Sequence, residues 1–321
     1  MLHRLAAAAL ACLFASPASA NDSIAKLGAG GLILIQADSI AMEAEDLYVS
    51  PSAIRVDYRF RNNAAEDKTH LVAFPMPLIE PGDYLESDVS VPEREHDNFM
   101  NFAVGVDGVA VTPRIEIRAL TGGLDVTGKL AALAIPLNPL AEATAKALNA
   151  VPKEKLSELL VMGAVRDAGD GFQPSWTLKS TYYWLQTFPA GKTIAVSHSY
   201  TPAVGLSFFY DMALAEKSYV DRFCIDAGTR KAIRKKLAAA KADSPLLMER
   251  QIQYILTTGA NWQDPIGDFR LVVDKEKPEA IVSFCMDGVK KIGPTLFEVR
   301  KTDFEPRRDI DILIVEEIPR E

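Results

Sequence analysis

Hydrophobic and polar positions alternate with a period of two over much of this chain, which is typical of strands with one buried face. The clearest segment is 54–61 (IRVDYRFR), whose apolar side chains point one way and whose Arg and Asp side chains point the other. Asp107-Gly108 separates two more apolar segments and is typical of a hairpin turn. Similar segments lie at 30–36, 41–49, 71–74, 101–106, 109–119, 176–188, 193–200, 250–257, 269–274, 280–285, 294–301 and 310–315.

Polar or Pro-Gly turns between neighbouring segments predict hairpins. We expect 54–61 to pair with 71–74 across the turn at 62–68. We also expect 193–200 to pair back on 176–188 across Pro189-Ala190-Gly191. Short strands at this spacing predict antiparallel, sandwich-like β domains.

The period changes to a helical one in two places. Segments 140–150 and 153–164 are rich in Ala, Leu, Glu and Lys, and Pro152 suits the start of the second helix. A further helix is expected over 227–242, with Asp226 as its N-cap. The fold class is therefore mostly β, with an inserted helical hairpin and one further helix.

This pattern predicts a domain plan. After a segment 1–20 come an N-terminal β domain over 21–130, the helical hairpin over 131–170 and a C-terminal β domain over 171–321. At this length the two β regions could be one unit or two.

The first 20 residues have the features of a secretory signal peptide. Arg4 is followed by an apolar run over 5–14, and Ala18-Ser19-Ala20 is a small-residue cleavage site. Cleavage after Ala20 predicts a periplasmic or secreted protein, and no later apolar run is long enough for a transmembrane segment. The alternative is a lipoprotein anchored at Cys12.

Cleavage would leave two cysteines, Cys224 and Cys285. An even number in an exported protein favours one structural disulfide. The alternative is a redox or nucleophilic cysteine, although the chain has no CxxC motif and no His within ten residues of either.

A formal net charge of −8 disfavours nucleic acid as a partner, because phosphate binding needs a basic surface. Positive charge is concentrated on the expected helix 227–242. This helix could dock an anionic polymer or a lipid surface, and a solvated helix face explains the same pattern. Its candidate docking residues are Arg230, Lys231, Arg234 and Lys235.

Motifs for catalysis are missing from the sequence. His70, His96 and His198 do not form a zinc motif, and no GxSxG nucleophile elbow occurs. We therefore expect neither a metal nor a cofactor. The acidic group Glu43, Glu45 and Asp46 could hold calcium, but a solvated strand face would show the same i, i+2 acids.

Several side chains remain candidates for binding a ligand. Trp176, Tyr182 and Trp184 could form a stacking platform, with Tyr182 and Trp184 on one face of a strand. Aromatic residues in strands also commonly form core. His70 and His198 complete the candidate set.

Several motifs together resemble a known family. They begin with Asn21-Asp22 and include LVAFPMP at 71–77, VSHSYTP at 196–202 and NWQDPIGDFRLVVDK at 261–275. The chain resembles the bacterial exported family called domain of unknown function 4424 over nearly its whole mature length. The resemblance implies an exported, mostly β protein without an assigned activity or catalytic residues. The segment 58–77 is also similar to strand pairs of vault/inter-alpha-trypsin-type interaction domains.

These observations favour a non-catalytic binding or interaction protein of the cell envelope, whose partner would be an envelope protein or polymer. Two alternatives remain open. One is an envelope-acting hydrolase that uses His198 or His70 with a carboxylate, and the other is a carrier of a small ligand held between the β regions.

Overall fold

The computed structural model describes residues 21–28, 31–239 and 247–317. The predicted signal peptide, Cys12 and positions 240–242 of the expected helix lie outside these residues. The described chain is mostly β, as the alternation predicts. None of its helices is both long enough and apolar enough to cross a membrane.

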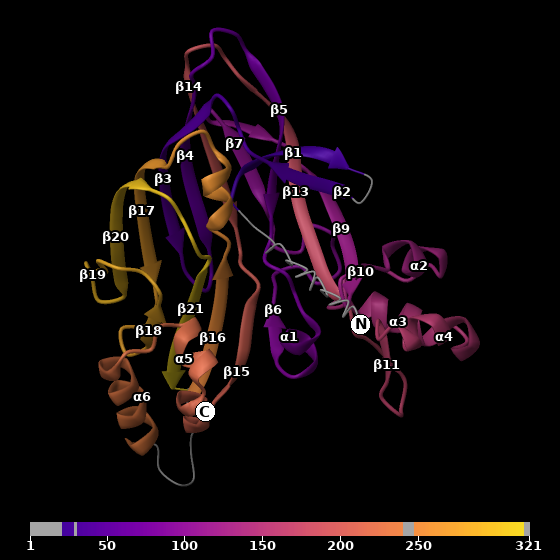
Figure 1. The fold of residues 1–321 in the computed structure, drawn as a ribbon. Helices are drawn as coiled ribbons and strands as arrows, with labels where there is room; N and C mark the ends of the chain where they lie inside the picture. Colours follow the sequence, from indigo (N-terminus) through magenta and orange to yellow (C-terminus); the bar gives the residue numbers. More distant parts are fainter. Residues whose placement is uncertain (1–20, 29–30, 240–246, 318–321) are drawn as a thin grey trace, which may run out of the picture.

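Two large sheets face each other across the molecule (Figure 1). In the six-stranded sheet every pairing is antiparallel, whereas in the eight-stranded sheet β17 and β3 run parallel. The first has the order β10 (Leu124–Asp125), β9 (Arg114–Thr121), β13 (Thr177–Phe188), β5 (Lys68–Pro75), β1 (Ser23–Gly28) and β2 (Gly31–Ile35). The second has the order β19 (Lys290–Lys291), β20 (Leu296–Phe304), β17 (Ile266–Asp274), β3 (Ile40–Val49), β4 (Ile54–Asn62), β14 (Thr193–Tyr200), β7 (Ala103–Val106) and β8 (Val109–Val111).

A third sheet has five strands, and four of them come from the C-terminal part of the chain. One large hydrophobic core contains side chains from all three sheets, including Val72, Val56 and Ile312. The strand order of the third sheet is β18 (Ile281–Phe284), β21 (Ile310–Glu317), β16 (Leu247–Tyr254), β15 (Val204–Phe209) and β6 (Asp88–Ser90). Because β3 of the N-terminal β region pairs with β17 of the C-terminal one, the two regions share a sheet and one hydrophobic core.

Strand β4 confirms the alternation in the sequence. Its residues alternate strictly between buried and exposed, and Val56 and Tyr58 face the core. The β7–β8 hairpin is also confirmed, because Asp107 and Gly108 both have positive φ angles (48° and 78°), as a type I′ turn requires.

The other two predicted hairpins are wrong. Strand β4 pairs with β14 and not with β5, while β5 pairs with β13. At each turn the chain crosses from one large sheet to the other, and the Asn62 side chain donates a 2.8 Å hydrogen bond to the Phe188 carbonyl between the two crossings. In facing sheets the apolar faces of β4 and β5 bury each other, which a flat hairpin could not achieve.

The predicted helical hairpin is present and has its own small core around Trp176 and Leu148. The indole Nε1 of Trp176 donates a 2.8 Å hydrogen bond to the Leu137 carbonyl. The helices here are α2 (Thr127–Ala132), α3 (Glu142–Ala150) and α4 (Lys153–Val161), beside the hairpin β11 (Val165–Asp167)–β12 (Phe172–Pro174). The remaining helices are α1 (Pro81–Leu85), α5 (Lys217–Arg222) and α6 (Ala227–Ala239), with the 3₁₀ turns η1 (Asp211–Ala215) and η2 (Thr257–Asn261).

Candidate functional site

A buried polar cluster surrounds the first described residues, Asn21 and Asp22, which are both 0% exposed. The Thr258 hydroxyl donates to the Asn21 carbonyl (2.8 Å), and the Trp262 indole donates to the Asp22 carbonyl (2.8 Å). The Asn21 side-chain amide donates to Glu45 Oε2 (3.0 Å). These bonds fix the start of the described chain inside the core.

Glu45 reaches this cluster because β3 contains a bulge. The pairing with β4 shifts between Met42 and Ala44, so the residues after the bulge change faces. Glu43 is therefore partly exposed and contacts Thr193 on the outer side, whereas Glu45 is buried. The expectation that Glu43 and Glu45 share one strand face is wrong. Burial raises the pKa of Glu45 to about 8.

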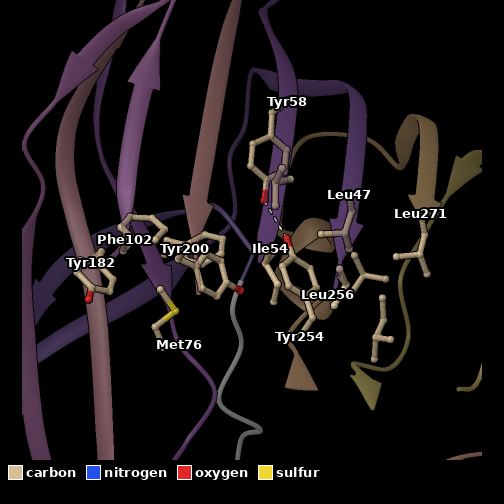
Figure 2. Packing of buried hydrophobic residues seen from close by; sticks show 14 of the residues in the cluster. Leu47, Ile54, Tyr58, Met76, Phe102, Tyr182, Tyr200, Tyr254, Leu256 and Leu271 are labelled. Atoms are coloured by element: carbon tan, nitrogen blue, oxygen red, sulfur yellow. Dashed lines mark hydrogen bonds between the residues drawn. The ribbon is translucent and has the colours of Figure 1, made fainter. Parts of the chain in front are cut away.

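Two tyrosines connect β4 and β16 beside Glu45. The hydroxyls of Tyr58 and Tyr254 lie 3.1 Å apart, and Figure 2 shows them pointing toward each other. Tyr58 donates to Asn21 Oδ1, and Tyr254 Oη lies 3.4 Å from Glu45 Oε1. Burial raises the pKa of both tyrosines far above the usual value, so both stay protonated donors.

His198 also belongs to this cluster. Its Nε2 lies 3.0 Å from Asp22 Oδ2, and both side chains are fully buried. The imidazole stacks on Phe74 with 5.0 Å between ring centroids. Within the described residues, His198 Nδ1 and Asp22 Oδ1 have no hydrogen-bond partner. His198 and Asp22 thus form a His–Asp pair. Because the core encloses both side chains, a substrate dissolved in the solvent could not reach them.

The other predicted ligand residues lie apart from one another. Trp176 belongs to the core of the helical region, while Tyr182 and Trp184 face the main core. All three are at most 5% exposed, so their rings contact protein and offer solvent no stacking face. His70 is half-buried on β5, where burial and the charge of Lys68 lower its pKa.

A larger cavity lies elsewhere, on the outer face of the eight-stranded sheet. It is a hollow of about 580 Å³, bounded by Gly108 at the β7–β8 turn and Arg300 on β20. Ala44, Ala195 and Ser197 line it with small side chains. We call it the outer hollow. Its volume falls within the range of roughly 300–1,000 Å³ that is usual for small-molecule sites.

Charged side chains of both signs line the outer hollow. Asp46 and Arg270 pair with each other through two 3.0 Å contacts. Asp57, Arg59 and Asp268 are exposed, and within the described part of the chain their side chains make no hydrogen bond or ion pair. The outer hollow therefore has both acidic and basic groups free for a ligand.

A second, smaller cavity of about 310 Å³ lies between α1 and the five-stranded sheet. Most of its polar side chains already form hydrogen bonds within the protein. Arg222 Nε donates to Asp311 Oδ1 (2.8 Å), Gln253 donates to the same oxygen (3.1 Å), and Asp309 Oδ1 accepts from Thr257 Oγ1 (2.8 Å). No histidine lines this cavity, the outer hollow or the third described cavity beside Val89.

The disulfide between Cys224 and Cys285 is confirmed, with Cα atoms 5.1 Å apart. It joins the connection between α5 and α6 to the end of β18. The neighbouring Phe223 is fully buried, and Ser283 Oγ donates to its carbonyl (2.9 Å). The bond therefore fixes α5 and α6 to the five-stranded sheet.

The basic helix α6 begins as predicted, because the Thr229 amide donates to the Asp226 carboxyl (2.6 Å). Two of the four candidate docking residues bind within the chain: Arg230 donates to the Leu214 carbonyl (2.9 Å), and Arg234 pairs with Asp211 (3.1 Å). The other two, Lys231 and Lys235, are exposed. Part of the positive charge thus anchors the helix to η1.

The family model for domain of unknown function 4424 matches residues 20–313. The chain belongs to this family. A search of curated proteins finds no match for this member of the family. The resemblance in the motifs is therefore confirmed, and the matched region contains the buried polar cluster, the outer hollow and both cysteines.

Two solved structures are distantly similar to this family member. One is a "putative nutrient binding protein" from Legionella pneumophila, with 15% identity and a TM-score of 0.49, covering 92% of this chain and 70% of that one. Another is an M1 zinc metallopeptidase from Deinococcus radiodurans, with 9% identity and a TM-score of 0.26, covering 88% and 43%. Within the described residues, no three His, Cys, Asp or Glu side chains are placed to hold a metal ion.

Sequence reasoning selected His198 for this family member but missed its partner Asp22. It considered Glu45 only as a calcium ligand and missed its contact with Asn21. It also missed Asp57 and Arg59, which line the outer hollow. The signal for the latter pair was the charged outer face of 54–61, which is also what a solvated strand shows.

Proposed function

We propose that this protein is an exported, non-catalytic binding protein of the cell envelope, and that the outer hollow binds a small solute with both an ammonium and a carboxylate. The observation that carries the proposal is the set of free charges on Asp57, Arg59 and Asp268 around small side chains. Arg59 would pair with the carboxylate, and Asp57 or Asp268 with the ammonium. Free amino acids and short peptides have this chemistry.

The sheet face gives such a ligand a rigid site. Ala44 pairs with Arg59 on β4 and with Asp268 on β17, so one cross-strand row brings the two opposite charges together. On the other side, Arg59 pairs with Ala195 on β14. Groups on paired strands are preorganised, which lowers the cost of ordering them around a ligand.

The test is binding of the twenty L-amino acids and of Gly-X dipeptides, measured by calorimetry. Ala195→Trp fills the outer hollow from an exposed position, and we expect it to abolish binding. Arg59→Gln should weaken binding at least tenfold, because it removes the partner of the carboxylate. The matched control is Ser199→Trp, on the same strand and the same outer face but outside the lining of the hollow.

Equal loss of affinity in the Ala195→Trp and Ser199→Trp proteins would show that the outer hollow is not the site. Failure of every probe to bind with a Kd below about 1 mM, which corresponds to roughly −4 kcal/mol, would reject this class of ligand.

A further inference from the structure

The buried position of Asn21 has a consequence if the signal peptide is removed. Cleavage after Ala20 would make Asn21 the first residue of the mature chain. Asn21 is 0% exposed, and its carbonyl, its side-chain amide and its side-chain oxygen all form hydrogen bonds within the polar cluster. A new terminal amine would therefore form inside the core.

Among the residues that the structure describes, the polar cluster has two carboxyl groups, and none of its hydrogen-bonding partners is a Lys or an Arg. Glu45 contacts the Asn21 amide and faces the Tyr254 hydroxyl, while Asp22 contacts His198. One oxygen of Asp22 is buried without a partner within the described residues. A buried carboxyl group that lacks a cation is costly when it ionises, and burial accordingly raises the pKa of Glu45.

We infer that hydrolysis of the Ala20–Asn21 bond supplies this missing cation, and that the mature α-ammonium of Asn21 is a buried counter-ion for Glu45 and Asp22. A signal-peptidase-class hydrolase adds one water across the bond. The water oxygen becomes part of the Ala20 carboxylate, and both water hydrogens end on the Asn21 nitrogen, which becomes –NH₃⁺. This inference depends on the predicted signal peptide and is independent of the ligand proposed for the outer hollow.

Covalent geometry limits how far the ammonium can be from its partner. The backbone nitrogen and the side-chain amide nitrogen of one Asn lie at most about 5 Å apart. The amide nitrogen is 3.0 Å from Glu45 Oε2. The ammonium therefore forms within roughly 8 Å of that carboxyl, where the low-dielectric surroundings make opposite charges interact strongly.

The test compares two forms of the protein, one that begins at Asn21 and one with Gly-Ser added before it. Each form is prepared with Glu45 and with Glu45→Gln, and thermal unfolding is measured at pH 7.5. We expect Glu45→Gln to lower the Tm of the form that begins at Asn21 by several degrees, because the ammonium loses its partner. In the extended form the same substitution should leave the Tm unchanged or raise it.

The matched control is Glu43→Gln, two residues away on β3 and outside the cluster, which should have the same small effect in both forms. Equal effects of Glu45→Gln in the two forms would overturn the inference.

A second measurement uses only the form that begins at Asn21. The inference can therefore be tested even if the extended form does not fold. Its α-amine should react with an amine-specific reagent at least tenfold more slowly in the native protein than in urea, as followed by mass spectrometry of the N-terminal peptide. An amine that reacts equally fast in both conditions is exposed, which would overturn the inference.

Discussion

Removal of the disulfide between Cys224 and Cys285 should destabilise the protein by an amount that follows from its place in the fold. The two cysteines are 61 positions apart. The enclosed segment contains β16 and β17, which lie in different sheets, so the bond restrains a long piece of the unfolded chain. For a loop of this size the chain-entropy model gives about 4 kcal/mol.

The native structure should persist without the bond, because apolar packing also holds this region. Phe223 and Ile225, on either side of Cys224, are 0% and 4% exposed in the small core between α5, α6 and the five-stranded sheet. Serine is a suitable replacement at position 285, because Cys285 Sγ lies 3.3 Å from the Arg222 carbonyl, to which a hydroxyl could donate. Most of the loss should therefore arise in the unfolded state.

Urea unfolding of the oxidised protein and of the Cys224→Ser/Cys285→Ser variant measures this loss directly. We expect the free energy of unfolding to fall by about 4 kcal/mol and the Tm to fall by roughly 6 °C. The m-value should rise, because the variant exposes more surface when it unfolds. The reasoning is refuted if the variant stays within about 1 kcal/mol of the oxidised protein.

Two further predictions concern the bulged strand β3. The first applies to a chain extended before Asn21, in which the pKa of Glu45 is about 8 in the folded state and 4.5 in the unfolded state. The folded state therefore holds this proton more tightly, and the free energy of unfolding should fall by up to about 5 kcal/mol as the pH rises from 4.5 to 8. Glu45→Gln should remove this slope in urea titrations across that range, and a slope that persists would assign it to another group. Gly267→Ala places a Cβ 2.7 Å from the Glu43 carbonyl oxygen and should cost about 1–3 kcal/mol by urea unfolding. Gly82→Ala meets no atom within 4 Å and should cost nothing, and equal losses in the two variants would contradict the steric argument.

Local patterns in the sequence predicted the elements of this fold well. The period of two over β4, the Asp107-Gly108 turn and the Asp226 cap each depend on a few neighbouring residues, and each is present in the structure. Such features could be predicted because strand alternation, a type I′ turn and an N-cap are decided by local stereochemistry.

Strand pairings and side-chain contacts between segments that are distant in the sequence were harder to predict. The sequence around β4 and β5 fits a hairpin, but the two strands lie in facing sheets because each apolar face needs the other as cover. The bulge after Met42 likewise gives no clear local signal, and yet it turns Glu45 into the core. A single inserted residue reverses the faces of all that follow, so the error affected the whole acidic group.

The outer hollow shows why a binding surface on a sheet is difficult to recognise from one strand. Asp57 on β4 is an ordinary exposed charge when it is considered alone. The register places it between Asp46 on β3 and Ser197 on β14, and places Arg270 on the far side of Asp46. Strands from three separate parts of the sequence, β3–β4, β14 and β17, thus form one row in which three charged side chains are followed by the small Ser197. That combination follows from the pairing of the strands, which is why the free charges around the hollow, and not the buried histidine selected from sequence, are the stronger basis for a binding function.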